Sequence, residues 1–283
     1  MSAELLALAT GGVLGGPYAM RLAQQNYRDL QQMGDAKTTP TREVRPNTAV
    51  EVSGTVSATA ETVPSPVTGT DTVCCVWQVE TWDKATKYNM WRPTAIGVTS
   101  VPFAIEEEYG QQRIALGTHT YELPSSSFDL VGQLKGLVEL TQTTQDSVGA
   151  GYVDEELSVE MQQWDAAVEV GAEESPPASI QRFVDETDPV HPATDSPLTN
   201  LVDIGRQHGS RRYREALLTP GDSCYTLGTA DENGDLTPDT GRLWVGRGTE
   251  ESLVATKRNH LLRNGAVGIG GSLLGLGATA LLL

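Results

Sequence analysis

The chain has 283 residues, enough for one or two domains with a sizeable core. It carries 37 Asp and Glu against 20 Lys and Arg, a formal net charge of −17, and 15 of the basic residues are arginine. This charge excludes nucleic-acid binding as an expected function, because a phosphate backbone requires a basic face. An acidic, lysine-poor and threonine-rich composition is typical of proteins in high salt, where counterions screen the self-repulsion. We therefore expect a halophilic source.

The two ends of the chain are apolar and glycine-rich, and they predict two transmembrane helices. The segment 265–283 contains no charged residue. At ~1.5 Å per residue it nearly spans the ~30 Å core of a bilayer. The segment 3–20 is the weaker of the two because it includes Glu4 and Pro17. A basic start and a cleavage site are missing, which disfavours a signal peptide, and a peripheral amphipathic anchor stays open as the alternative.

Glycines lie four residues apart in both apolar segments, at Gly11 and Gly15 in the first and at Gly271 and Gly275 in the second. Small residues at this spacing let helix backbones approach closely. We therefore expect the two helices to pack on each other or on a second copy of the chain, which would give a homo-oligomer. The open alternative is that glycine is common in membrane helices in general.

Basic residues flank the region between the two apolar segments. Arg21 and Arg28 follow the first segment, and Lys257, Arg258 and Arg263 precede the second. By the positive-inside rule, these clusters place the central region in the cytoplasm. We therefore expect a multi-pass protein of the cell membrane with two spans, whose first partner is the lipid bilayer.

Between the spans, the residue pattern predicts a mainly β (β-rich α+β) soluble domain over 48–248. A helix and a linker rich in threonine and proline precede it over 21–47, and a juxtamembrane helix capped by Thr249 follows over 249–264. Alternating or continuous apolar runs predict the strands, and clusters of Pro, Gly and Asn mark the turns. The predicted strands are 49–59, 73–82, 96–105, 113–116, 213–218, 224–227 and 243–245.

Residues 146–196 differ from the rest, because they carry 13 carboxylates and a single Lys or Arg, Arg182. We interpret them as a hydrated acidic insertion that is mostly loop, with one strand over 157–164. A cation-binding surface is the alternative.

The three cysteines include no CxxC pair, and their odd number does not suggest a disulfide framework. Adjacent Cys74 and Cys75 point to opposite faces of a strand, so we expect one of them in the core. A disulfide between Cys75 and Cys224 is a minor alternative.

No constellation of residues predicts a catalytic centre, a metal site or a cofactor. The four histidines form no HxxxH pair, which disfavours structural zinc. The run Asp231–Asp235 (DENGD) lacks the glycine and the terminal glutamate of an EF-hand, so we interpret it as a turn. Neither a GxSxG nucleophile elbow nor a phosphate-binding loop is present. A basic cluster at 211–214 (RRYR) could meet lipid headgroups or a partner, although paired surface charges are the simpler interpretation.

Several motifs follow one another between the two apolar segments: VEVSGTV (50–56), PSPVTG (64–69), CCVWQVE (74–80), VPFAIEEEYG (101–110) and RYREALLTPGDSCYTLGTA (212–230). Their order resembles the GIDE, or beside-a-membrane, domain of the mitochondrial-anchored E3 ubiquitin ligases, here in a haloarchaeal member. The resemblance picks out structural or interaction positions: Gly54, Pro66, Gly69, Cys75, Phe103, Gly110, Tyr213, Glu215, Pro220, Gly221, Asp222 and Gly228.

In that family a RING finger follows the second span, and it needs eight Cys or His ligands for two zinc ions. This sequence runs to Leu283 with three Cys and four His, so we expect no RING and do not carry the ligase activity over. The resemblance then implies a membrane-anchored, non-catalytic module that binds a protein partner or acts as a sensor. A component of a ubiquitin-transferase-like system with catalysis in another chain, and a structural membrane-organising oligomer, stay open. In the mitochondrial relatives the domain faces the intermembrane space, which differs from the cytoplasmic placement that the charges predict.

Overall fold

The computed structural model describes residues 39–83, 90–108, 110–122, 150–154, 156–187, 190 and 207–255. The chain forms two units. The larger consists of Thr38–Ser125 and Thr143–Gly248, and the smaller of Met1–Lys37, Ser126–Gln142 and Thr249–Leu283. Nearly all of the described residues belong to the larger unit.

Both predicted transmembrane helices, 3–20 and 265–283, lie outside the described residues, together with their glycines at 11, 15, 271 and 275. Within the part of the chain that is described, no helix is long and apolar enough to cross a membrane. In the smaller unit, residues 250–255 are helical. The backbone N–H of Ser252 donates to Thr249 Oγ1 at 3.4 Å, so this helix begins at the predicted cap.

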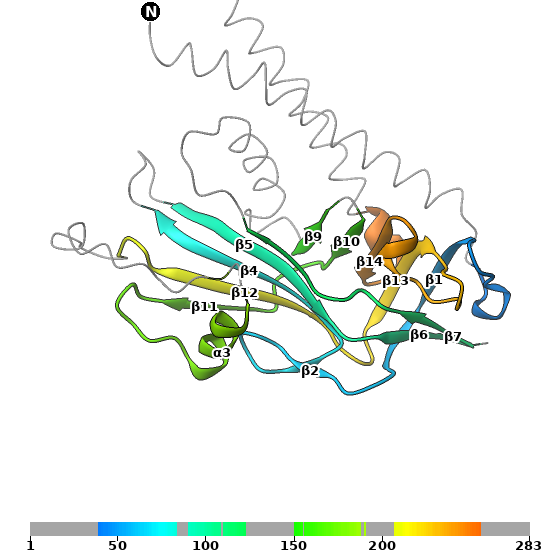
Figure 1. Ribbon diagram of the computed structural model, residues 1–283, viewed down its shortest axis with the longest axis horizontal. Coiled ribbons are helices and arrows are strands. Elements are labelled where there is room, and N and C mark those ends of the chain that lie inside the picture. The colour runs from blue at the N-terminus through cyan, green and yellow to red at the C-terminus, as the bar shows by residue number, and fades with distance from the viewer. Residues whose placement is uncertain are drawn as a thin grey trace, which may run out of the picture. The chain divides into compact units, whose positions relative to one another are not determined.

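The larger unit is mainly β, as predicted, and its first layer is an antiparallel sheet that we call the β4 sheet (Figure 1). Its described strands are, in spatial order, β11 (Ala166–Val170), β12 (Arg211–Leu218), β4 (Cys74–Asp83), β5 (Met90–Ser100) and β8 (His119–Glu122). The predicted strands 73–82 and 213–218 are therefore confirmed, and they lie side by side from the Cys74–Leu218 pair to the Thr81–Arg211 pair.

A second layer, the β1 sheet, contains the predicted strands 49–59, 224–227 and 243–245. Its described strands are β7 (Gly110–Ile114), β6 (Phe103–Glu107), β1 (Ala49–Ala58), β13 (Ser223–Thr229), β14 (Leu243–Arg247), β10 (Leu157–Glu160) and β9 (Gly151–Val153). All neighbours in it are antiparallel except β10 and β14. The remaining elements are η1 (Thr41–Glu43), the ribbon β2 (Val63–Pro64) and β3 (Asp71–Thr72), α3 (Ala178–Glu186) and η3 (Pro238–Thr240).

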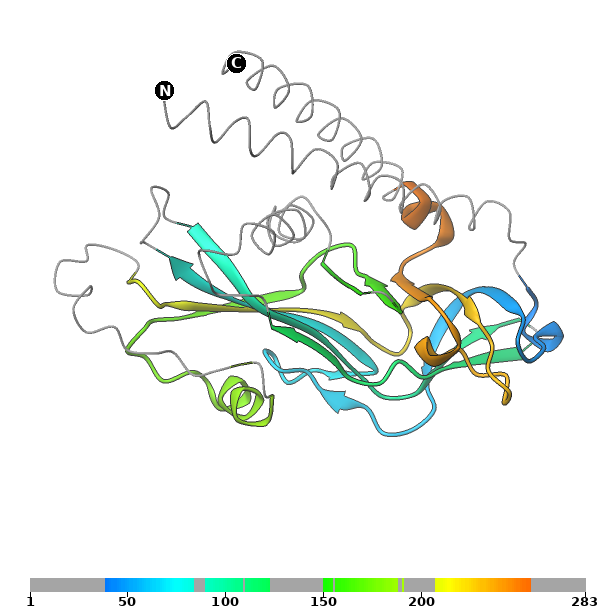
Figure 2. The same ribbon diagram turned by 45° about the horizontal axis from the view of Figure 1, so that its top comes forward.

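Two hydrophobic cores lie on opposite faces of the β4 sheet. The first contains side chains from both sheets, such as Val52 of β1 and Val76 of β4, which are fully buried. The second joins the other face to α3, where Trp77 packs edge-on against Phe183 with ring centroids 4.9 Å apart. Figure 2 shows α3 alongside β11 and β12 on that side. Because both faces of β4 are covered, its strand reads as a nearly continuous apolar run.

The predicted strand 96–105 is wrong, because the chain forms two strands there. β5 ends at Ser100, and β6 begins at Phe103 in the other sheet. The chain changes sheet at Val101 and Pro102, and proline cannot donate a ladder hydrogen bond. The predicted strand 113–116 is displaced to Gly110–Ile114. The displacement arises because β7 begins at Gly110, where it pairs directly with the end of β6.

The acidic segment 146–196 is more ordered than the sequence suggested. It supplies β9, β10, β11 and α3, so its interpretation as mostly loop is wrong over these elements. The predicted strand 157–164 is shortened to Leu157–Glu160. In these elements exposed carboxylates alternate with buried residues such as Val170 and Val184. The high carboxylate content suggested a loop because it outweighed the few apolar residues that indicate strands and a helix.

All three cysteines are free and buried, which corrects the expectation that only one of Cys74 and Cys75 lies in the core. Cys74 faces the first core and Cys75 the second. Cys224 shares the first core with Cys74, not with Cys75, so the Cys75–Cys224 disulfide does not form. Burial raises the pKa of the Cys74 thiol to about 12 and raises the pKa of the other two thiols as well.

We predict that the native chain reacts with no equivalent of Ellman's reagent at mildly alkaline pH, and with three equivalents after unfolding. The raised pKa also sets a pH dependence. An unfolded thiol loses its proton near pH 9.0, whereas Cys74 keeps its proton up to about 12, so the free energy of unfolding falls as the pH rises across this window. Denaturant titrations across the window measure this fall. Rapid labelling of the folded chain would contradict the prediction.

Candidate functional site

The positions selected by the family resemblance fall into several separate groups in the structure. Glu215 of β12 meets the 64–69 turn that contains Pro66 and Gly69. Its buried carboxylate accepts hydrogen bonds from the backbone N–H groups of Val67 at 2.7 Å and Thr68 at 3.0 Å, and from the hydroxyls of Ser65 at 3.1 Å and Thr68 at 2.5 Å. The carboxylate thus replaces the water that this turn would otherwise bind.

The backbone of the same turn explains its glycine. Gly69 has φ of +71°, a left-handed conformation that favours glycine. The Gly69 N–H donates to the Ser65 carbonyl at 3.1 Å, and the Ser65 N–H donates to the Thr70 carbonyl at 2.9 Å. The turn is therefore a fixed element that covers part of the second core beside Val67.

A second group, Pro220–Asp222, forms the turn between β12 and β13. The Asp222 carboxylate accepts from the Thr219 N–H at 2.8 Å and from its hydroxyl at 3.0 Å, while Gly221 has φ of +98°. The Gly221 N–H donates to the Val56 carbonyl, and the Val56 N–H donates to the Asp222 carbonyl, both at 2.8 Å. This turn therefore ties the end of β12 to β1 and acts as a structural element.

The remaining selected positions lie in packed interiors or at close approaches of the chain. Phe103 and Cys75 are buried in the first and second core, respectively. A side chain at Gly54 would collide with the Glu106 carbonyl oxygen of β6, at Gly110 with the Thr41 hydroxyl, and at Gly228 with Leu243. Of these positions, Cys75 lies near enough to Glu215 to interact with it electrostatically. Gly54, Gly110 and Gly228 belong to the close approaches described above and do not form one site with it.

The basic cluster at 211–214 does not consist of paired surface charges, which corrects the simpler interpretation. Arg212 and Arg214 point to one face of the β4 sheet, where their side chains are 17% and 7% exposed. Arg212 pairs through Nε with the fully buried Glu80 carboxylate, and Arg214 Nε lies 3.7 Å from it. Gln78 Nε2 donates to Glu80 at 3.0 Å. This network neutralises the buried charge of Glu80 in the part of the sheet where β4 pairs with the start of β12.

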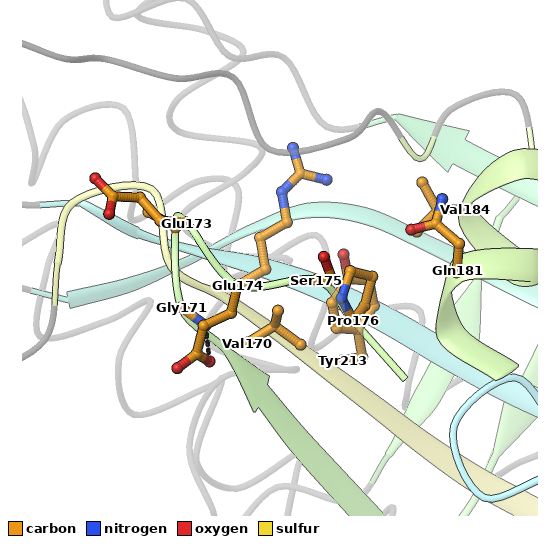
Figure 3. A pocket seen from close by; sticks show the side chains of 11 residues that line it. Val170, Gly171, Glu173, Glu174, Ser175, Pro176, Gln181, Val184 and Tyr213 are labelled. Atoms are coloured by element: carbon orange, nitrogen blue, oxygen red, sulfur yellow. Dashed lines mark hydrogen bonds between the residues drawn. The ribbon is translucent and has the colours of Figure 1, made fainter. Parts of the chain in front are cut away.

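Arg211 and Tyr213 point to the opposite face and line a cleft where β11 ends and β12 begins. The cleft has a volume of about 260 Å³. Its walls are the loop 171–176 and helix α3, as Figure 3 shows for Glu173 and Glu174 on the loop and for Gln181 and Val184 on the helix. Val170, the last residue of β11, pairs with Arg211 in the ladder and contributes to the floor.

The charges of the cleft are unevenly distributed. The Arg211 guanidinium is hydrogen-bonded to the Tyr213 phenol. Burial lowers the pKa of Arg211, and the neighbouring Tyr213 offsets part of this shift. Burial raises the pKa of Tyr213, and the neighbouring Arg211 offsets part of that shift. At the rim, Glu173 and Glu174 are exposed. The cleft therefore combines a half-buried cation with an acidic edge.

The loop that forms this edge is held by its own side chain. Glu174 Oε2 accepts from the Gly171 N–H at 2.9 Å, as the dashed line in Figure 3 marks. Ser175 and Pro176 continue along the wall toward α3, whose Ser179 hydroxyl donates to the Val67 carbonyl at 3.2 Å. The helix thereby connects the cleft to the turn beneath which Glu215 is buried.

Sequence reasoning identified part of this cleft. It named Tyr213 individually and Arg211 within the basic cluster, but it assigned the loop 171–176 and α3 to a hydrated insertion. The available signal was the short run SIQRFVDE, in which Ile180, Phe183 and Val184 share one helical face. The cleft can bind and orient a ligand, whereas its residues provide no paired nucleophile and base.

Other polar groups in the described residues form structural contacts. The Asp231 carboxylate accepts the N–H groups of Asn233 and Asp235 at 2.8 Å each, which confirms the predicted turn. No group of three or more His, Cys, Asp and Glu in the described part of the chain is placed to hold a metal ion.

No family model, no curated protein and no solved structure matches the chain. The resemblance to the GIDE domain therefore stays a prediction that rests on the order of the motifs. What the structure adds is the position of these motifs in a two-layered β unit.

We predict that Glu215→Gln lowers the free energy of unfolding by roughly 2–4 kcal/mol, because a buried amide turns an N–H group toward donors that need an acceptor. Denaturant titration measures this change, and thermolysin cleavage before Val67 reports the release of the turn. The matched control is Glu106→Gln at an exposed position of β6, which should change stability by about 0.5 kcal/mol or less. Equal effects of the two substitutions would show that the turn does not depend on Glu215.

Proposed function

We propose that the chain is a membrane-anchored, non-catalytic interaction module that resembles the GIDE domain, and that it binds a protein partner through the cleft beside Arg211. Two spans, 3–20 and 265–283, anchor the module in the cell membrane. The basic residues next to both spans support a cytoplasmic location for the domain between them.

The observation that carries this proposal is the cleft itself. It brings together apolar floor residues, a half-buried guanidinium, a phenol and a polar rim, which is the composition of a recognition site. The site lies on rigid elements, since Arg211 and Tyr213 belong to a strand that pairs on both sides with β11 and β4. A rigid site binds a partner at a smaller entropic cost than a site that must first become ordered.

Strand β11 supports a peptide partner in particular. In the described part of the chain it is the last strand of the β4 sheet beyond β12, so one of its edges has no neighbouring strand there. It leads directly from Ala166 into Val170 at the floor of the cleft. An extended segment can add to such an edge through main-chain hydrogen bonds while its side chains reach the adjoining pocket.

The test of partner binding is affinity capture from native membranes with the full chain, with a variant that lacks residues 35–262, and with Arg211→Gln. We expect a defined partner to be recovered with the full chain, lost with the deletion, and reduced at least about fivefold by Arg211→Gln, because a charge-assisted contact is removed. Arg182→Gln is the matched control, since Arg182 is exposed on α3 outside the cleft. Identical recovery with all four chains would refute the proposal.

The membrane placement has a separate test in sealed, right-side-out vesicles. We expect residues 48–248 to resist added protease until the vesicles are opened, because the domain then lies on the cytoplasmic face. A protease-resistant fragment is detected with an antibody to the domain, and a tagged periplasmic or external protein is the control for access. Digestion of the domain in intact vesicles would place it on the outer face, and recovery of the chain in the soluble fraction would exclude the two spans.

A further inference from the structure

The cleft contains charges of both signs in a fixed arrangement, and this limits the chemistry of its ligand. Arg211, Tyr213 and Val170 line it from the two strands, whereas Glu173 and Glu174 line it from the loop 171–176 and are exposed. A purely anionic ligand would meet repulsion from the rim and from a chain of net charge −17. A purely cationic ligand would meet Arg211. A ligand with a negative end and a nearby positive group fits both.

We propose that the cleft binds the C-terminal carboxylate of a peptide whose last residue has a basic side chain. The carboxylate would bind to Arg211, which presents several N–H donors in a planar fork, and to the Tyr213 hydroxyl. The basic side chain would extend to Glu173 and Glu174. This inference rests on the proposed function, because it names the part of the protein partner that enters the cleft.

Three features favour the end of a peptide over an internal acidic side chain. The cleft, at about 260 Å³, is small for a ligand site and suits one terminal residue. A guanidinium whose pKa is lowered by burial gains most from a full negative charge. In addition, β11 ends at Val170, the cross-strand partner of Arg211, so a strand added parallel to β11 at its edge away from β12 would end beside the cleft.

The experiment measures fluorescence anisotropy of labelled peptides against the full chain in detergent micelles. The probe is fluorescein–Gly-Ser-Val-Ala-Lys with a free carboxylate, compared with the same peptide as its C-terminal amide and with a version ending in Glu. We expect the acid to bind at least about tenfold more tightly than the amide, because one charge-assisted pair is lost. We expect the Lys ending to bind about twofold to fivefold more tightly than the Glu ending, since the rim charges are exposed.

Variants assign these differences to residues. Arg211→Gln should abolish the preference for the acid over the amide, and Glu173→Gln should reduce the preference for Lys over Glu. Arg182→Gln and Glu186→Gln, both exposed on α3 and outside the cleft, should preserve both preferences. If Arg211→Gln does not fold, as judged by thermal unfolding, Arg211→Lys replaces it and should weaken the preference for the acid. The comparison of acid with amide on the unaltered chain needs no variant.

Equal binding of acid and amide, or no binding of either, would overturn the inference. Competition by free lysine as strong as by the peptide would also overturn it, because the ligand would then be an amino acid. The failure of this inference is distinct from that of the proposed function. If capture from membranes depends on Arg211 but the peptide acid binds no better than the amide, the proposed function stands and the partner binds the cleft through a group other than its C-terminal carboxylate. A preference for the acid without any captured partner removes the interaction role instead.

Discussion

The buried carboxylate of Glu215 lies under the 64–69 turn, with hydrogen bonds from two backbone N–H groups and two hydroxyls. A charge without water requires partners on every side, and here a single turn supplies them. The position of the turn then determines what lies next to it. Val67 contributes to the second core, and its carbonyl accepts a hydrogen bond from Ser179 of α3, so the helix that forms one wall of the cleft is connected to the same carboxylate.

Strand β12 carries two different kinds of surface because successive side chains point to opposite faces. On one face Arg211, Tyr213 and Glu215 form the cleft and the anchor of the turn. On the other, Arg212 and Arg214 neutralise the buried Glu80. The run of arginines therefore has no single role. One member lines a cleft and two hold the sheet together, although the three are within four residues of one another.

Much of the fold could be predicted, because β1 alternates and β4, β12 and β13 each contain a run of apolar residues. The structure also explains why the rest was missed. The change of sheet at Val101–Pro102 has little composition signal, and the strands of the acidic segment have too few apolar residues to outweigh their carboxylates. Of the site, Tyr213 and Glu215 were named from the resemblance, but sequence alone did not show that they serve different purposes. That difference depends on α3 and the 64–69 turn, which are brought together only by long-range contacts.

The pairing of β1 with β13 has a consequence for the biogenesis of the protein. The register joins Ala49 to Thr229, so the ladder between β1 and β13 cannot form until the end of the domain has been synthesised. The ladder between β4 and β12 likewise requires a strand that is synthesised late. During synthesis neither layer can close until most of the chain has left the ribosome, and non-local strand pairing is slow. The exposed edges of β1 and β4 during that interval make the nascent domain a candidate client of chaperones. The many carboxylates of the acidic segment 146–196 keep that part of the chain hydrated before its strands pair.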